Sequence, residues 1–192
     1  MKTFMMGMLL FLASTFANAT LISESYVGQF DELNARLYLS FDITQDNSLF
    51  EVQSLGFLGG INAEGTVIDA GGFHNYSFLF DSNSNLLAQD YGYGTTLSQV
   101  LNTGSYVFAF TQQDNFLLSG DVFTGNWVGT GWPDWQGQTQ SYAFDLQGQN
   151  IANVTISGFG FTPASTAVSE PATLALFGLS IFGLVARKRI KQ

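Results

Sequence analysis

The middle of this chain alternates between apolar and polar side chains with a period of two residues. In residues 36–43, RLYLSFDI, every second side chain is large and apolar. The same alternation returns in NYSFLFD at 75–81, SYVFAFT at 105–111, SYAFDLQ at 141–147 and NVTIS at 153–157. Successive side chains of a β-strand point to opposite faces, so the pattern predicts strands that each have one buried face.

Clusters of turn-forming residues separate these stretches, among them TQDNS, DSNSN, NTG and QGQN. Residues 21–69 are expected to add two or three strands, and no long helical period occurs before residue 172. Eight to ten short strands in one domain predict an all-β fold over residues 20–161. The expected architecture is an antiparallel β-sandwich, jelly-roll-like, with a signal helix before it and a hydrophobic helix after it.

The N-terminus has the three parts of a secretory signal peptide at residues 1–19. Lys2 provides the positive start, and residues 4–16 form the apolar stretch. Ala17 and Ala19 form an A-x-A cleavage site, which small side chains fit. A core helix is the alternative, but it does not require this order of parts. We therefore expect signal peptidase to leave Thr20 at the mature N-terminus.

The C-terminus pairs an uncharged apolar segment with a basic cluster. Residues 172–186 have apolar side chains on every face of the implied helix, which predicts a transmembrane helix rather than a surface helix. Its length of about 22 Å is short for a ~30 Å hydrocarbon core. Positive charges remain on the cytoplasmic side, so the cluster after the helix is expected to stop transfer across the inner membrane. Its members are Arg187, Lys188, Arg189 and Lys191.

A short motif, Ser169-Glu170-Pro171, precedes this helix, and residues 162–168 read as a linker of small residues. The motif, helix and basic tail at 169–192 together resemble the PEP-CTERM sorting signal of bacterial envelope proteins, which is also classified as an ice-binding protein C-terminal domain. Family members usually have Pro-Glu-Pro, so Ser169 departs from the pattern. The resemblance implies processing by a membrane-embedded exosortase in a Gram-negative cell that makes exopolysaccharide. A plain membrane anchor is the alternative.

A second resemblance concerns residues 76–110. They are similar to the second half of a bacterial pre-peptidase C-terminal-type sandwich, in which an Asp-x-x-x-Asn turn, an acidic turn and a Gly-x-Tyr follow one another. The matching positions are Asp81, Asn85, Asp90, Gly104 and Tyr106. The resemblance implies a secreted accessory module without catalysis of its own, and it supports the sandwich fold.

The charge of the domain excludes one class of partner. Formal net charge is −9 for the whole chain, but between Thr20 and Ser169 only Arg36 is basic and fourteen residues are acidic. So acidic a body repels phosphate backbones, which argues against nucleic acid as a partner. The chain also lacks cysteine, which excludes thiol catalysis and thiolate metal sites.

One acidic cluster fits the start of a calcium loop. Asp81, Asn83 and Asn85 follow the Asp-x-Asn-x-Asn spacing, and Asp90 is positioned to supply a further carboxylate. The sixth and twelfth positions of an EF-hand are not met. The alternative is an ordinary hairpin turn, which Asp, Ser and Asn favour.

The three tryptophans lie close together in the sequence. Trp127, Trp132 and Trp135 fall within GNWVGTGWPDWQGQ, a Gly-rich segment expected to be a loop. Indole faces on a loop stack on the C–H faces of sugar rings, which predicts a carbohydrate site. Alternatively, the indoles fold back and fill the open end of the sandwich.

No catalytic machinery is expected. His74 is the sole histidine, and no Gly-x-Ser-x-Gly element accompanies it. The sequence therefore predicts a non-catalytic exported protein of the cell surface or extracellular matrix, sorted by an exosortase and associated with exopolysaccharide or biofilm. A carbohydrate-binding module is the first alternative. An ice-binding protein is the second, although no regular row of Thr is present.

Overall fold

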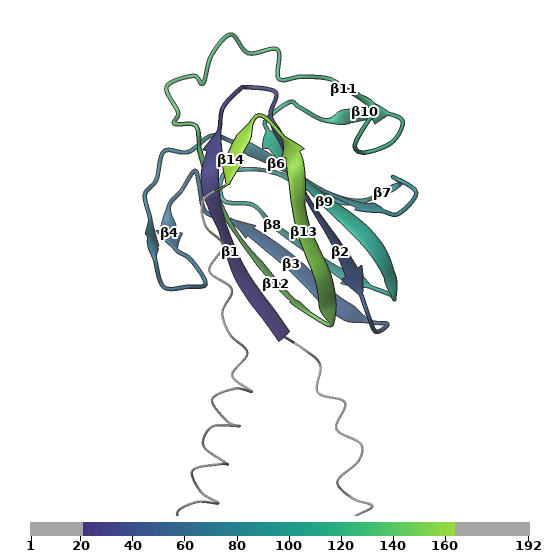
Figure 1. Cartoon of the computed structure of the whole chain (residues 1–192). Helices are drawn as coiled ribbons and strands as arrows, with labels where there is room; N and C mark the ends of the chain where they lie inside the picture. The colour runs from purple at the N-terminus through teal and green to yellow at the C-terminus, as the bar shows by residue number, and fades with distance from the viewer. Residues whose placement is uncertain (1–20, 164–192) are drawn as a thin grey trace, which may run out of the picture.

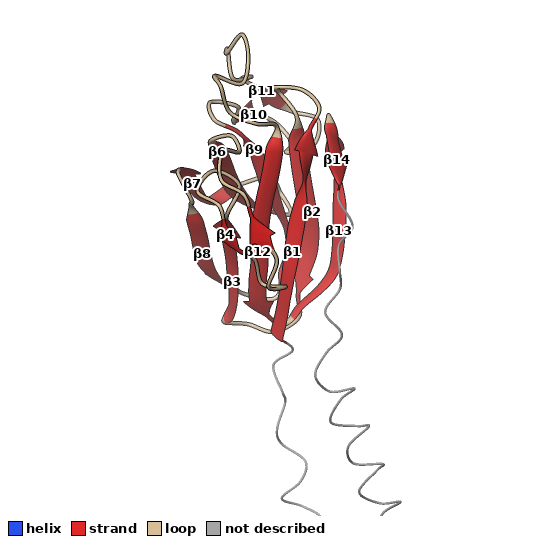
Figure 2. Ribbon diagram, turned by 90° about the vertical axis from the view of Figure 1, so that its left-hand side faces the viewer, coloured by secondary structure: helices blue, strands red, loops and turns tan. Residues whose placement is uncertain are grey.

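Two antiparallel sheets facing each other form the body of the protein. The computed structural model describes residues 21–163, and within them the chain forms strands and no helix (Figure 1). The first sheet has the order β14-β1-β12-β3-β8 and the second β13-β2-β9-β6-β7, so the predicted all-β sandwich is confirmed. Figure 2 shows the strands of both sheets running along the same long axis.

Ten strands make up the two main sheets of this described part. Those of the first sheet are β1 (Leu21–Phe30), β3 (Ser48–Ser54), β8 (Thr96–Leu101), β12 (Ser141–Gln149) and β14 (Phe161–Pro163). Those of the second are β2 (Arg36–Ile43), β6 (Asn75–Asp81), β7 (Leu86–Gly92), β9 (Gly104–Gln112) and β13 (Ile151–Phe159). Two small hairpins are added by β4 (Gly60–Ile61) with β5 (Val67–Ile68) and by β10 (Leu117–Ser119) with β11 (Asn126–Trp127).

The last strand changes sheets at the edge of the sandwich. Gly160, with φ of 66°, turns the chain from β13 in the second sheet into β14 in the first. A left-handed φ is readily adopted by glycine, because it has no Cβ. β14 then pairs with β1 up to Pro163, opposite Gly28. The strand thus extends two residues into the segment expected to be a linker.

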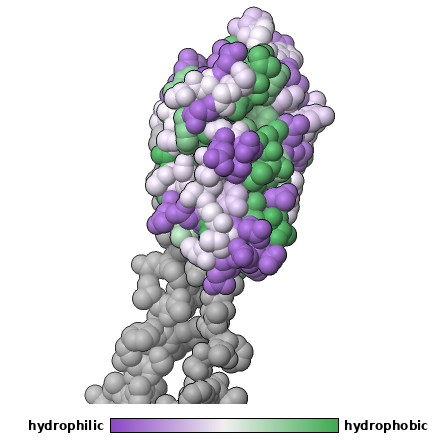
Figure 3. Space-filling view, turned by 90° about the vertical axis from the view of Figure 1, so that its right-hand side faces the viewer, coloured by the Kyte–Doolittle hydropathy of each residue, from purple (hydrophilic) through white to green (hydrophobic). Residues whose placement is uncertain are grey.

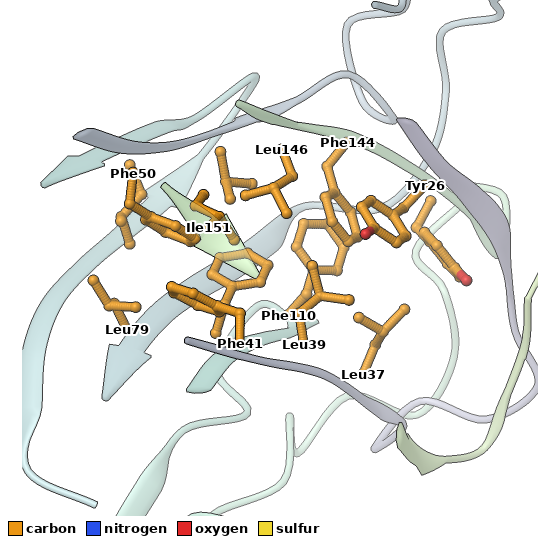
Figure 4. Close-up of a cluster of buried hydrophobic side chains, with 14 of the residues drawn as sticks. Tyr26, Leu37, Leu39, Phe41, Phe50, Leu79, Phe110, Phe144, Leu146 and Ile151 are labelled. Atoms are coloured by element: carbon orange, nitrogen blue, oxygen red, sulfur yellow. The ribbon is translucent and has the colours of Figure 1, made fainter. Parts of the chain in front are cut away.

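Aromatic and aliphatic side chains fill the space between the sheets (Figure 4). Phe110 of β9 stacks on Phe144 of β12 with ring centroids 5.0 Å apart, which joins the second sheet to the first. Phe41 of β2 and Phe50 of β3 stack at 4.7 Å in the same way. Such pairs add to the stabilisation from apolar area alone. The predicted inward face of β2 is confirmed, since its four large apolar residues are buried: Leu37, Leu39, Phe41 and Ile43.

The second sheet is buried on its outer face as well. A second cluster forms there from Tyr38, Phe78, Phe80, Val107, Ala109 and Val122. The connection between β9 and β12, residues 113–140, covers it through Leu117 and Trp127. Tyr76, Phe78 and Phe80 therefore share one face as expected, but this is the outer face. The expectation of one buried face per strand is wrong for β2, β6 and β9, because each of them also has residues buried in the main core on its other side.

The long connection and the chain entrance lie at opposite ends of the sandwich. β1 begins with Leu21 at the lower end in Figure 1, and β14 runs antiparallel to β1, back toward that end. Gln112 at the end of β9 pairs with Asn75 at the start of β6, and both lie at the upper end with the 113–140 connection. Residues near this end are therefore the most distant from Leu21.

Candidate functional site

The residues expected to direct export lie outside the described range. These are the signal cleavage residues Ala17, Ala19 and Thr20, the motif Ser169-Glu170-Pro171, the hydrophobic segment 172–186 and the basic cluster after it. Among residues 21–163, no helix is long and apolar enough to cross a membrane.

Asp81 organises the turn between β6 and β7. Its Oδ1 accepts hydrogen bonds from the backbone N–H of Asn83 at 2.8 Å and of Asn85 at 2.9 Å. Its Oδ2 accepts a bond from the side-chain amide of Asn85 at 2.9 Å, and these bonds lower the pKa of the Asp81 carboxyl. This is the hydrogen-bonding role of an Asx turn.

Asp90 does not join the other residues of the expected calcium loop. It pairs with Ser77, which is four residues before Asp81 along β6. At ~3.3 Å per residue, this separates the two carboxylates by roughly 13 Å along the strand. Within the described residues, no cluster of three or more His, Asp or Glu side chains is arranged to hold a metal ion.

The three tryptophans have different environments. Trp127 packs on the outer cluster, where its Nε1–H donates to the Val122 carbonyl at 3.1 Å. Trp135 packs against the main core, 5.5 Å from the ring of Phe73. Trp132 is the exposed one, at 36%. The loop therefore does not present three indoles together: Trp127 and Trp135 fold back onto apolar clusters, and Trp132 is exposed.

Part-buried and exposed polar contacts hold the 113–140 connection in place. Thr130 donates its backbone N–H to the Asn34 side chain at 2.9 Å. Nearer the start of the connection, the Ser84 hydroxyl accepts a hydrogen bond from the Val122 N–H at 3.0 Å. The same hydroxyl donates to the Asp121 carboxylate at 3.3 Å. The N–H of Phe123 donates to the same aspartate, which lowers the pKa of the Asp121 carboxyl. These bonds fix the conformation of the 113–140 connection.

Asp114 connects two aromatic side chains at the upper end of the sandwich. One carboxylate oxygen accepts the hydroxyl of Tyr76 at 3.2 Å, and the other accepts the Nε1–H of Trp132 at 3.1 Å. The ring of Tyr76 in turn contacts Tyr91 of β7, with centroids 5.2 Å apart. Partial burial raises the pKa of the Tyr76 hydroxyl, and the bond to Asp114 raises it further.

A groove of about 360 Å³ opens beside this bridge. It is lined by Tyr76, Gln89, Asp90, Tyr91, Phe116 and Leu117. Tyr91 is 64% exposed, so its ring faces solvent along most of its surface. Asp90 accepts the Tyr91 N–H through Oδ1 at 2.8 Å, and no other described residue bonds its carboxylate. We name this the Tyr91 groove. Figure 3 views the molecule from the right-hand side of Figure 1, and this face shows apolar and polar residues next to one another.

A small notch lies on the other side of Trp132. Its lining residues are His74, Gln112, Gln113, Trp132, Gln136 and Gln138, and its volume is about 10 Å³. The Nδ1 of His74 is 2.9 Å from the amide oxygen of Gln113, and its ring packs edge-on against Tyr93 at 3.9 Å. In this arrangement, the imidazole has an amide partner where a catalytic triad would require a carboxylate.

The sequence does not indicate the Tyr91 groove or the Asp114 bridge. Their residues come from β6, β7 and the 113–140 connection, and alternation predicts a strand only for the first of these. The exposure of Tyr91 and the edge position of β7 are properties of the folded sheet, so the sequence gives no signal for them.

The C-terminal residues provide the match to known proteins. A profile for the PEP-CTERM protein-sorting motif matches residues 167–189. The chain carries a PEP-CTERM motif. The matched range includes Ser169-Glu170-Pro171, the apolar segment and Arg187 to Arg189. The PEP-CTERM motif implies exosortase-dependent sorting and association with the cell envelope, which confirms the resemblance seen in the sequence. No curated protein matches the chain.

Proposed function

We propose that this protein is a non-catalytic component of the extracellular matrix of a Gram-negative bacterium, where it associates with exopolysaccharide. The observation that supports the proposal most strongly is the PEP-CTERM motif at residues 167–189. The motif follows a single β-sandwich domain, so the sandwich is the part that exosortase processing delivers to the envelope. In this proposal the chain meets signal peptidase first, then the inner membrane for a limited time, then exosortase.

The chemistry of the described domain supports a binding role. His74 contacts the amide oxygen of Gln113, and the chain has no cysteine, so a Cys–His catalytic pair is excluded. The domain is strongly acidic, which opposes association with nucleic acid and with anionic lipid. Neutral carbohydrate is an extracellular polymer that is compatible with these properties.

A carbohydrate-binding module is the second candidate, and the exposure of Trp132 favours it. Of the three tryptophans proposed for a sugar site, Trp127 and Trp135 are packed against apolar clusters. Trp132 alone presents its indole to solvent while its N–H is bonded to Asp114. A sugar site on this loop therefore requires partners for Trp132 other than the two neighbouring indoles.

Fractionation of cells that produce the full chain tests the proposed function. We expect the mature protein in the polysaccharide-containing matrix fraction, and we expect its release into the medium when polysaccharide synthesis is deleted. A strain that lacks exosortase is the matched control, because it leaves the precursor in the inner membrane. Recovery of the mature protein in the medium, whether or not polysaccharide is made, would refute the association with exopolysaccharide.

A further inference from the structure

We propose that the Tyr91 groove and Trp132 together form a binding surface for a neutral polysaccharide chain. The inference rests on the proposed function, and it adds the location of the site and the class of glycan. The two parts of the surface are joined through Asp114, which bonds Tyr76 on the groove side and Trp132 on the other.

Three exposed aromatic side chains mark the path of the polysaccharide. Tyr91 is 64% exposed, Phe116 is 37% and Trp132 is 36%. Aromatic faces attract the C–H faces of pyranose rings, and successive rings of a polysaccharide require successive aromatic faces. The arrangement comes from β7 and the 113–140 connection, so the full path exists only in the folded domain.

The aromatic rings are held before a ligand arrives. The ring of Tyr91 contacts the ring of Tyr76 with an angle of 52° between the ring planes. The indole N–H of Trp132 donates to the Asp114 carboxylate at 3.1 Å. A side chain that is already ordered loses little conformational freedom on binding, so more of its contact energy appears as affinity. Tyrosine and tryptophan suit this use, because each has only two side-chain torsions.

Polar groups with unused hydrogen-bonding capacity lie beside the aromatic rings. Asp90 has an oxygen that no described residue bonds, and Gln89, which also lines the groove, is exposed. In the notch, Gln112 is 4% exposed, and its Oε1 has no hydrogen-bond partner among the described residues. A buried polar atom without a partner is rare in folded proteins. The notch volume of about 10 Å³ accommodates one hydroxyl-sized group.

Charge limits the class of glycan to neutral polymers. Asp90 and Asp114 lie on the surface, and Arg36 is the sole cationic side chain in residues 21–163. Its guanidinium is covered by the rings of Phe159 at 4.3 Å and Trp127 at 5.1 Å. A uronate or phosphate chain would meet uncompensated negative charge here, whereas sugar hydroxyls donate to carboxylates.

The surface lies where an envelope protein can use it. Tyr91 and Tyr76 pair near the upper end of the second sheet, opposite the end where Leu21 enters. β14 also leads the chain toward the Leu21 end. The upper end of the second sheet, where β7 ends, lies away from the Leu21 end (Figure 1).

Binding of matrix polysaccharide by site variants tests the inference. The exported full-length gene product is purified, and the matrix polysaccharide of the producing cells is separated by anion exchange into neutral and acidic fractions. We expect the wild type to bind the neutral fraction. We expect Tyr91→Ala and Trp132→Ala each to weaken binding at least tenfold. The acidic fraction is expected to show no binding at low salt.

Tyr93→Ala is the matched control. Tyr93 is two residues from Tyr91 and is 61% exposed, but its ring packs on His74 and Phe57 and does not line the groove. We expect this variant to bind within twofold of the wild type. Thermal unfolding of all variants checks that each is folded.

The outcomes separate this inference from the proposed function. If the protein fractionates with the matrix but the Tyr91 and Trp132 variants bind the neutral fraction like the wild type, the surface is wrong and the proposed function stands. Preferential binding of the acidic fraction overturns the assignment of the glycan class. If the wild type neither binds matrix polysaccharide nor fractionates with the matrix, the proposed function itself fails.

Discussion

Asn75 shows how one polar side chain links the two sheets from inside the core. It is fully buried at the start of β6, and its amide oxygen accepts the Ser54 hydroxyl of β3 at 2.7 Å. Its amide nitrogen donates to Ser77 and Thr95, each at 3.1 Å. A buried amide is tolerated when its bonds are satisfied, and the geometry of these bonds then fixes the relative position of the strands.

Buried tyrosines set the response of the protein to alkaline pH. Burial raises the pKa of Tyr142 to about 12, and the negative charge of Asp31 acts in the same direction. Burial also raises the pKa of Tyr26 well above its usual value, aided by the hydrogen bond to Glu24. An unfolded tyrosine loses its proton near pH 10. Between about pH 10 and 12 the unfolded chain therefore releases protons that the folded protein retains, and deprotonation favours unfolding.

We predict that stability is fully retained below pH 10 and falls as the pH rises toward 12. Tyr142→Phe removes one of the responsible hydroxyls, so the decline in its free energy of unfolding is expected to be shallower than in the wild type. Urea unfolding at pH 8, 10 and 11 measures the difference. Tyr93→Phe, at an exposed position, is the control and is expected to follow the wild type. Parallel declines for Tyr142→Phe and the wild type would contradict the assignment.

At the scale of elements, the 113–140 connection has two roles. One part covers the outer cluster, through Leu117 and Trp127. Another part projects Trp132 and Asp114 at the upper end. The bonds from Asn34 and Ser84 hold both parts against the sheet. A loop anchored in this way can combine packing and recognition, because the packed residues fix the positions of the exposed ones.

We predict different stability effects for two tryptophans of this connection. Trp127→Ala should lower the free energy of unfolding by about 3 kcal/mol, because it exposes the outer cluster and removes the indole beside Arg36. Trp132→Ala should cost less than about 1 kcal/mol, as expected at an exposed position. Denaturant unfolding of both variants provides the comparison, and equal losses would show that the environments of the two indoles are assigned wrongly.

The β6–β7 turn gives a second prediction at this scale. The oxygens of Asp81 already accept three hydrogen bonds within the turn, and Asp90 lies away from it on β7. We therefore expect the same melting temperature in chelator and in ~10 mM calcium, a concentration above the affinity range of extracellular calcium modules. Asp81→Ala should lower the melting temperature equally in both conditions. A rise with calcium that Asp81→Ala abolishes would restore the calcium loop.

At the scale of the whole molecule, a folded sandwich is combined with a sorting signal. The PEP-CTERM motif at residues 167–189 implies exosortase-dependent sorting to the cell envelope, and the described residues form the sandwich. Proline is tolerated in the first turn of a helix, and the residue before it is pushed toward an extended conformation. The sequence Glu170-Pro171 therefore predicts an extended segment that a protease can bind.

We predict that the mature protein begins at or near Thr20 and contains no peptide from Leu174 onward. Replacing Glu170-Pro171 with Ala-Ala should leave an uncleaved form in the inner membrane. The matched control is the double substitution of Ser165 and Thr166 by Ala, which lies just outside the matched residues and should be processed normally. Mass spectrometry and membrane fractionation provide the measurement. A mature surface protein that retains residues 172–192 would contradict cleavage by exosortase and would show that the tail is a membrane anchor.

The sequence by itself determined the fold class and the PEP-CTERM sorting motif. A period of two residues predicts strands, and the stretch at 36–43 is β2 residue for residue. Enzymes recognise a sorting signal in an extended or membrane-inserted chain. The signal therefore depends on neighbouring residues in the sequence, and it can be identified without the tertiary structure. The match at 167–189 confirms that part of the interpretation.

The tertiary structure decided which faces are buried and which residues meet. Alternation divides β6 into two faces, but only the 113–140 connection made the face of Phe78 part of a second core. The same connection separated Trp132 from Trp127 and brought Asp114 to Tyr76, 38 positions earlier in the chain. The physical reason is that an alternating pattern predicts only which residues share a face of one strand. Contacts between distant segments depend on how the whole chain buries its apolar surface.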